Sequence, residues 1–260
     1  ATIKLDSTWE KGYYALGKYY NKLLDLKTSP TSEKINPRDI SGEYERKTIS
    51  FYLKAMQCGI KYLYEALPKV VTVWLDFSAN ISEVPGELQD TTKVTVLAEK
   101  RKHLQSIHDD IAKASEKLPK YIWYTVFSQL LSRILHPNKV TSQLIIMIAN
   151  QVVLEYPEHA LWSLLAQYKS TQAERSRKAK KIIDLFTSSE SKNSSISNAT
   201  TVQAAKKIFN ELIEVSKKQL PKVKGPLSLK DDFGFDHTSV PCPLVVPAKI
   251  NFDITLPTSV

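Results

Sequence analysis

Three stretches of this chain carry a proline followed within a few residues by a tryptophan, and they constrain the fold more than any other feature. They are residues 67–77, 118–133 and 156–166. A proline in the first turn of a helix loses no intrahelical hydrogen bond, since its N–H would have no partner there. The tryptophan then offers a large apolar surface to a neighbouring helix. Each stretch therefore predicts a helix that proline opens and tryptophan anchors.

Composition and charge narrow the class of protein further. Only 7 glycines occur in 260 residues, which favours helix. The net charge of +9 permits contact with nucleic acid or acidic proteins, although a solvated basic surface is the simpler interpretation. Cys58 and Cys242 lie far apart and form no Cys-x-x-Cys pair, so we expect a reducing compartment and no zinc site.

The ends of the chain and its most apolar run give two more expectations. The chain starts without Met and without a secretory signal, which suggests a piece of a longer intracellular protein. The run Leu144–Ala149 is much shorter than the roughly 20 residues that span a bilayer. We therefore expect no membrane segment and treat the three Asn-x-Ser/Thr sequons, at Asn80, Asn193 and Asn198, as chance matches.

Apolar residues recur with helical spacing along most of the chain. Tyr13-x-x-Leu16-Gly17-x-x-Tyr20 is similar to the first-helix pattern of a tetratricopeptide repeat, and short gaps between the later helices favour antiparallel neighbours. The predicted fold is all-α, an α-solenoid of antiparallel helix pairs of TPR or HEAT type. The expected helices are one capped by Ser7 with Glu10, one over 42–65, those opened by Pro68, Pro119, Pro137 and Pro157, and those over 91–117, 174–186 and 202–220.

Two segments depart from this pattern and suggest the domain limits. Residues 187–201 are rich in Ser and carry almost no apolar surface, which predicts a mobile loop. Beyond Pro221 prolines exclude long helices, and residues 244–246 and 250–256 are typical of short strands. We therefore expect a helical-repeat domain over 1–220 and a Pro-rich, β-containing segment over 221–260.

Candidate chemical groups are few, and we predict no catalytic, cofactor-binding or metal-ligating residue in this chain. Asp232-Phe233-Gly234 matches the metal-binding triplet of kinases, but only helices precede it, so we interpret it as a chance match. The basic run in helix 174–186 lacks interleaved aromatic residues and favours a solvated face over nucleic-acid binding. The histidines are expected to be surface or hydrogen-bonded residues: His103, His108, His136, His159 and His237.

Four blocks of the sequence together resemble one family. They are residues 8–22, 67–76, 127–134 and 156–162. In this order and spacing they are similar to the C-terminal part of the FAT domain of ATR-type checkpoint kinases, with fungal members as the expected group. Residues 243–257 resemble more loosely the segment that leads into the kinase N-lobe.

The resemblance implies a regulatory scaffold rather than a catalytic centre. In this family the FAT domain is a helical clamp around the kinase domain of a nuclear serine/threonine kinase that responds to DNA damage and replication stress. The resemblance also implies ATP and Mg²⁺ for the full-length kinase, an obligate ATRIP-type partner, a dimer of heterodimers, and indirect recruitment to single-stranded DNA coated with replication protein A. No membrane is implied.

Two alternatives stay open at this stage. A freestanding helical-repeat adaptor could bind protein or nucleic acid through helix 174–186. Thr171-Gln172 has the substrate dipeptide of the family and lies in a predicted loop, whereas Ser128-Gln129 and Ser142-Gln143 lie in predicted helices. Because the motif is so short, absence of modification is the default interpretation for Thr171.

Overall fold

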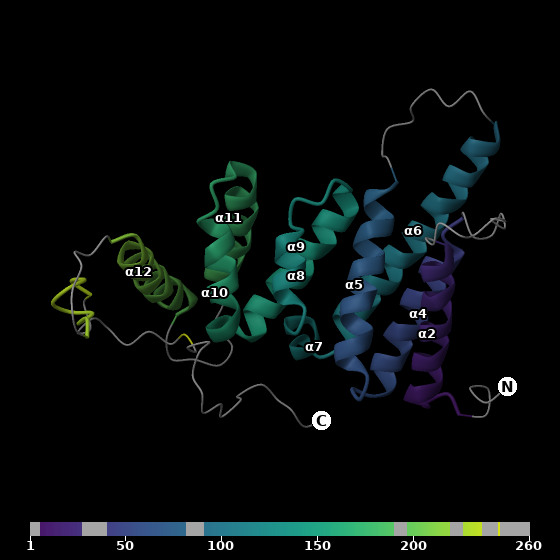
Figure 1. Cartoon of the computed structure of the whole chain (residues 1–260), viewed down its shortest axis with the longest axis horizontal. Helices are drawn as coiled ribbons and strands as arrows, with labels where there is room; N and C mark the ends of the chain where they lie inside the picture. The colour runs from purple at the N-terminus through teal and green to yellow at the C-terminus, as the bar shows by residue number, and fades with distance from the viewer. Residues whose placement is uncertain are drawn as a thin grey trace. The chain divides into compact units, whose positions relative to one another are not determined.

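The computed structural model describes residues 6–27, 41–81, 91–189, 197–218, 226–235 and 244 (Figure 1). Ten helices lie within these residues. The chain divides into two compact units, residues 1–149 and 150–260, and each is described by itself.

The first unit is built from antiparallel helices. Its long helices are α2 (Glu10–Lys27), α4 (Glu43–Cys58), α5 (Leu63–Ala79) and α6 (Thr91–Lys117). Figure 1 shows α2, α4, α5 and α6 running alternately in opposite directions, and α4 packs against the other three. Two short helices follow, α7 (Lys120–Tyr124) and α8 (Phe127–Ser132), and then the first part of α9 (Lys139–Glu155).

The second unit contains α10 (Pro157–Tyr168), α11 (Ala173–Ser188) and α12 (Asn198–Lys217), which pack against one another. The predicted all-α class with antiparallel helix pairs is therefore confirmed. None of the described helices is both long and apolar enough to cross a membrane.

Close packing of α2 on α4 explains the tetratricopeptide-like spacing in the first helix. A Cβ atom on Gly17 would lie 2.5 Å from Cδ1 of Tyr52, whose side chain is only 4% exposed. One turn later, the rings of Tyr20 and Phe51 stack with centroids 5.7 Å apart. Gly17 therefore occurs where an aromatic ring of the partner helix lies directly on the backbone of α2.

The turn between α4 and α5 corrects two sequence predictions. The helix expected over 42–65 ends at Cys58, because Gly59 is extended (φ 178°) and Glu10 of α2 occupies the space beside it. The Glu10 carboxylate accepts a hydrogen bond from the N–H of Tyr62 at 3.2 Å. The capping box expected between Ser7 and Glu10 is therefore wrong, since α2 starts at Glu10 and this carboxylate serves the α4–α5 turn instead.

Prolines open some of the helices as predicted. Pro119 immediately precedes α7 and Pro157 is the first residue of α10, whereas Pro137 lies in the turn two residues before α9. The prediction for Pro68 is wrong, because α5 begins at Leu63 and includes Pro68 in its interior. Burial of the apolar face of α5 offsets the hydrogen bond that Pro68 cannot donate.

The segment predicted as a mobile loop, 187–201, is shorter than expected. Helix α11 continues to Ser188, and α12 begins at Asn198 rather than Val202. The Ser197 hydroxyl caps α12 by accepting from the N–H of Thr200 at 3.2 Å. The Asn198 side chain is 8% exposed and donates to the carbonyl of Phe186 at 3.0 Å, which ties the two helix ends together. Residues 190–196 lie outside the described residues.

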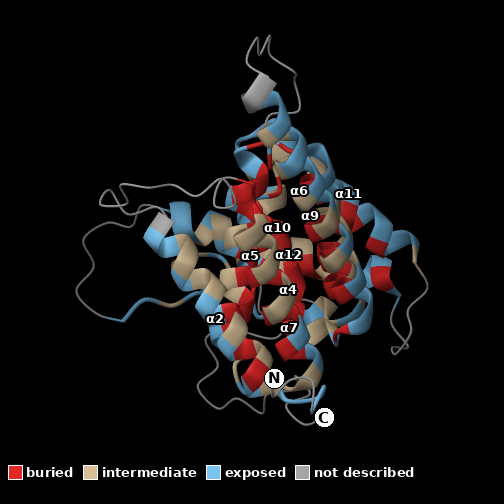
Figure 2. Ribbon diagram, turned by 90° about the vertical axis from the view of Figure 1, so that its right-hand side faces the viewer, coloured by how far each residue is buried: buried red, intermediate tan, exposed pale blue. Residues whose placement is uncertain are grey.

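The described helices carry both buried and exposed residues (Figure 2). The tryptophans differ in burial, and only part of the expectation holds. Trp74 and Trp123 are fully buried. Trp162 is half-buried against Phe209, with ring centroids 6.4 Å apart, and Trp9 is 39% exposed. The anchors of the first two proline-tryptophan helices are therefore core residues, while that of α10 lies at the margin of its unit.

The tail is described only in part. Of the two predicted strands, 244–246 and 250–256, all residues except Leu244 lie outside the described residues. The limits of the expected domains, 1–220 and 221–260, stay a prediction.

The contact between Gly17 and Tyr52 predicts whether Gly17→Ala raises or lowers the free energy of unfolding. Gly→Ala in a helix normally stabilises by about 1 kcal/mol, whereas overpacking a buried site costs about 1–3 kcal/mol. We expect Gly17→Ala to lower the free energy of unfolding, measured by urea denaturation of the 260-residue chain. Gly12→Ala is the control, because the Cβ there meets the exposed ring of Trp9, which can move away. An increase in stability for Gly17→Ala would contradict the described packing.

Candidate functional site

Buried polar side chains of the first unit meet in one cluster, where the turn between α8 and α9 lies against α5 and α6. His108, His136, Asn138, Thr141 and Ser78 are all at most 7% exposed. Buried polar groups are costly unless they are hydrogen-bonded. The partners of each group therefore define what the cluster does.

His136 joins the α8–α9 turn to the last turn of α5. Its Nδ1 accepts a hydrogen bond from the backbone N–H of Asn138 at 3.1 Å, so this nitrogen carries no proton. Its Nε2 lies 2.9 Å from the carbonyl of Leu75, which can only accept, so Nε2 carries the proton. The Ser78 hydroxyl donates to the same carbonyl and lies 3.2 Å from Nε2. These contacts fix His136 as the neutral Nε2–H tautomer.

Asn138 continues the chain of hydrogen bonds into α9. It caps the helix, because its Oδ1 accepts from the backbone N–H of Thr141 at 3.0 Å. The Thr141 hydroxyl donates its one proton to the same oxygen at 3.1 Å. That hydroxyl can therefore only accept from His108 Nε2, which lies 2.9 Å away on α6.

His108 is held in an apolar setting. The edge of its ring meets Trp74 of α5, with ring centroids 6.5 Å apart and planes at 81°. Burial lowers the pKa of His108 from its ordinary value of 6.5 to about 4, although the nearby carboxylate of Asp109 opposes the shift. His108 is thus suited to be neutral at pH 7.

The cluster is built to fix backbone rather than to react. His108 is 28 residues from His136 in sequence, and one directed chain of hydrogen bonds joins α6, α9 and the α8–α9 turn, which His136 ties to α5. Among the described residues no group of three or more His, Cys, Asp or Glu side chains could hold a metal ion. We therefore interpret the cluster as structural: its hydrogen bonds hold α5, α6 and the start of α9 in fixed positions. We call this hydrogen-bonded cluster the lock.

From the sequence alone, the histidines of the cluster are expected to be separate surface or hydrogen-bonded residues. A usable signal was present, because Asn138 three residues before Thr141, directly after Pro137, has the spacing of a helix cap. Of the other histidines, His103 is half-buried with a lowered pKa from burial, His159 is half-buried at the start of α10, and His237 lies outside the described residues.

The kinase-like triplet Asp232-Phe233-Gly234 ends a single hydrogen-bonded turn. Asp232 accepts from the backbone N–H of Ser228 at 2.6 Å. Gly234 has a left-handed φ of 69°, and the N–H groups of Gly234 and Phe235 bond to the carbonyls of Lys230 and Leu229. The bond from Gly234 to Lys230 has the spacing of the αL motif that closes helix ends, where the left-handed position is usually glycine. A local folding role thus accounts for the triplet.

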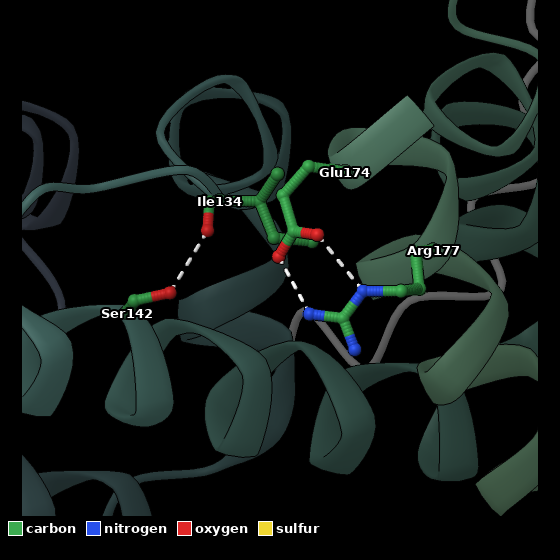
Figure 3. A network of polar contacts seen from close by, with 4 residues as sticks. All are labelled: Ile134, Ser142, Glu174 and Arg177. Atoms are coloured by element: carbon green, nitrogen blue, oxygen red, sulfur yellow. Dashed lines mark hydrogen bonds and ion pairs between the residues drawn. The ribbon is translucent and has the colours of Figure 1, made fainter. Parts of the chain in front are cut away.

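Two arginines of the basic helix α11 are bound to neighbouring side chains. Arg177 binds both carboxylate oxygens of Glu174, at 2.8 and 2.7 Å, and this pair lowers the pKa of Glu174 (Figure 3). Arg175 donates to the side chains of Gln167 and Gln172. The solvated-face interpretation is therefore favoured over a continuous nucleic-acid surface.

The three Ser/Thr-Gln dipeptides differ in access. Thr171 is exposed in the turn before α11, and Ser128 is exposed within α8. Ser142 is buried in α9, and its hydroxyl donates to the carbonyl of Ile134 at 2.9 Å (Figure 3). Only Thr171 combines exposure with an irregular backbone.

Replacing His136 tests the lock directly. His136→Leu leaves the Leu75 carbonyl and the Asn138 N–H buried without their partner, which costs about 2–4 kcal/mol of unfolding free energy. Urea denaturation at pH 7 measures this loss. His103→Leu is the control, since His103 is half-buried outside the cluster. Equal effects of the two substitutions would contradict the lock.

The lowered pKa of His108 predicts a pH dependence. Between about pH 6.5 and pH 4 the unfolded chain binds a proton that the folded chain excludes, so the unfolding free energy falls as pH falls. We expect the wild-type chain to lose on the order of 2 kcal/mol more over this range than His108→Gln, whose amide can still donate to Thr141. Identical pH profiles for the two chains would contradict burial of a neutral His108.

Comparisons with known proteins identify relatives. A family model described as "Serine/threonine-protein kinase ATR-like, HEAT repeats" matches residues 106–205. The chain is 34% identical over 250 residues to serine/threonine-protein kinase MEC1 of Candida albicans. The aligned region covers 95% of this chain and 10% of the relative. It is 30% identical over 259 residues to protein kinase rad3 of Schizosaccharomyces pombe, covering 98% of this chain and 11% of that protein.

Similarity extends beyond fungi. Serine/threonine-protein kinase ATR of Arabidopsis thaliana is 32% identical over 195 residues, which cover 67% of this chain and 7% of the relative. The chain thus spans about a tenth of the length of the curated relatives it matches. With its all-α architecture, these matches show that the chain is a helical-repeat segment of the ATR-type kinase family, with HEAT repeats over residues 106–205.

Proposed function

We propose that this segment is part of the FAT helical scaffold that clamps the kinase domain of an ATR-type nuclear serine/threonine kinase in the DNA-damage and replication-stress checkpoint. The observation that carries the proposal is similarity over nearly the whole chain to proteins named as kinases of this type, of which the chain is about a tenth. The segment contributes stiffness and surface rather than chemistry.

The buried contacts of the first unit support the role of a rigid scaffold. Fully buried Trp74 and Trp123 occupy the interior of the first unit, and the His136 contacts join the last turn of α5 to the α8–α9 turn. Such contacts resist sliding of one helix past another, because each slide would leave buried polar groups unpaired. A clamp needs this property if it is to hold a catalytic domain in one arrangement.

The wider context of the proposal follows from the family. The whole protein would use ATP and Mg²⁺ in a kinase domain held in cis, pair with an ATRIP-type partner, assemble as a dimer of heterodimers, and reach single-stranded DNA through replication protein A. A reading frame that continues from Val260 into a kinase domain supports this context, and a stop codon there supports the freestanding adaptor instead.

The adaptor alternative depends on the basic helix α11, and the contacts of that helix count against it. Arg175 and Arg177 are engaged with neighbouring side chains. A salt-dependent gel shift of single-stranded DNA by the 260-residue chain would favour the alternative over the scaffold.

The scaffold proposal predicts that a core tryptophan controls the output of a kinase whose catalytic residues are untouched. Trp123→Ala in the full-length protein creates a cavity that costs about 3–5 kcal/mol locally. We expect lower abundance, or lower phosphorylation of a Ser-Gln peptide per molecule of enzyme. Trp9→Ala is the matched control, because Trp9 is 39% exposed. Normal abundance together with normal activity for Trp123→Ala would contradict the proposal.

A further inference from the structure

A small pocket opens beside the histidine cluster, at the start of α9. Its volume is about 170 Å³, and Arg101, His108, Asn138 and Val140 are among the side chains that line it. This volume is below the roughly 300 Å³ at which pockets for drug-sized ligands begin. The pocket is therefore suited to a small chemical group.

Two buried side chains bring unused polar atoms to this pocket. Asn138 is 7% exposed, and its Oδ1 already accepts two hydrogen bonds from Thr141, while its Nδ2 has no hydrogen-bond partner within the described residues. His108 is 5% exposed and uses Nε2 for Thr141, which leaves Nδ1 without a partner among those same residues. Neither Nδ2 of Asn138 nor Nδ1 of His108 takes part in the hydrogen bonds of the lock.

The start of α9 favours negative charge in the pocket. The N-terminus of α9, a helix of 17 residues, carries N–H groups without intrahelical partners and the positive end of the helix dipole. Arg101 also lines the pocket, and none of the described residues that line it is acidic. Asp109, which follows His108 on α6, accepts from the side chain of Gln105 at 2.9 Å.

We propose that this pocket is a binding site for a small oxyanion, a carboxylate or a phosphoryl group. The ligand accepts hydrogen bonds from Nδ2 of Asn138 and from the first turn of α9. A bound anion also favours a proton on Nδ1 of His108. The titratable groups that act on His108 are Asp109 on α6 and His136 in the α8–α9 turn, while α5 contributes the uncharged ring of Trp74.

Titration with two probes separates the sources of such a group. Sodium phosphate and sodium acetate are added separately to the 260-residue chain at constant ionic strength, set with sodium chloride. NMR follows the backbone amide of Val140 and the ring of His108. We expect saturable shifts with at least one probe and a higher pKa of His108 in its presence. Tighter binding of phosphate indicates a phosphoryl ligand, and tighter binding of acetate indicates a carboxylate.

Two substitutions test the site while preserving the fold. Asn138→Asp keeps the helix cap, because Asp caps as well as Asn, but replaces the donor with a carboxylate oxygen. Val140→Asp places a carboxylate in the first turn of α9, where it is favourable for the helix. We expect each to weaken binding at least about tenfold. The controls are Asn210→Asp, the same charge change on the exposed side of α12, and Val140→Thr.

The outcomes are decisive because helix content and cooperative unfolding are checked for every variant. Absence of saturable shifts with both probes would overturn the proposal. Binding by both Asp variants that equals wild type would also overturn it, as would an equal loss in Asn210→Asp, because that would reflect net charge alone.

Discussion

The first unit depends most on the ring of His136, whose two nitrogens bond to backbone groups of different elements. Nδ1 accepts from the turn that starts α9, and Nε2 donates to the end of α5. Only a neutral imidazole with its proton on Nε2 can do both. The Asn138 cap and the bond from His108 to Thr141 use other atoms, and there too each donor meets an acceptor.

A second contact between residues far apart in sequence joins the start of α2 to the turn between α4 and α5. Glu10, the first residue of α2, reaches the turn between α4 and α5 and accepts from Tyr62. Gly59 leaves room for that carboxylate. Helix ends are thus closed by side chains from other helices, and this gives a stack of helices a fixed geometry without a catalytic centre.

The sequence predicted those features that depend on local pattern. Helix 91–117 was placed at its observed limits, because its apolar spacing is regular and its ends are marked. Prolines at first turns were interpreted correctly for Pro119 and Pro157. Gly17 fell in a recognisable repeat pattern, and the structure supplies its reason in the ring of Tyr52.

The missed features depend on contacts between distant residues. Gly59 is a local signal for the end of α4, but the contact of Glu10 with the α4–α5 turn cannot be read from residues 42–65 themselves. Likewise Pro68 was assigned to a helix start, because the burial that lets α5 begin at Leu63 arises only on packing. The histidine cluster was missed for the same reason, since His108 and His136 belong to different elements.

The tautomeric state of His136 tests the account most directly. Nitrogen-15 NMR of the ring at pH 7 distinguishes a protonated nitrogen from one with a free lone pair. We predict a neutral His136 with its proton on Nε2 and a hydrogen-bonded lone pair on Nδ1. A proton on Nδ1, in either the neutral or the charged form, would contradict it, because Nδ1 would then face the N–H of Asn138 donor to donor.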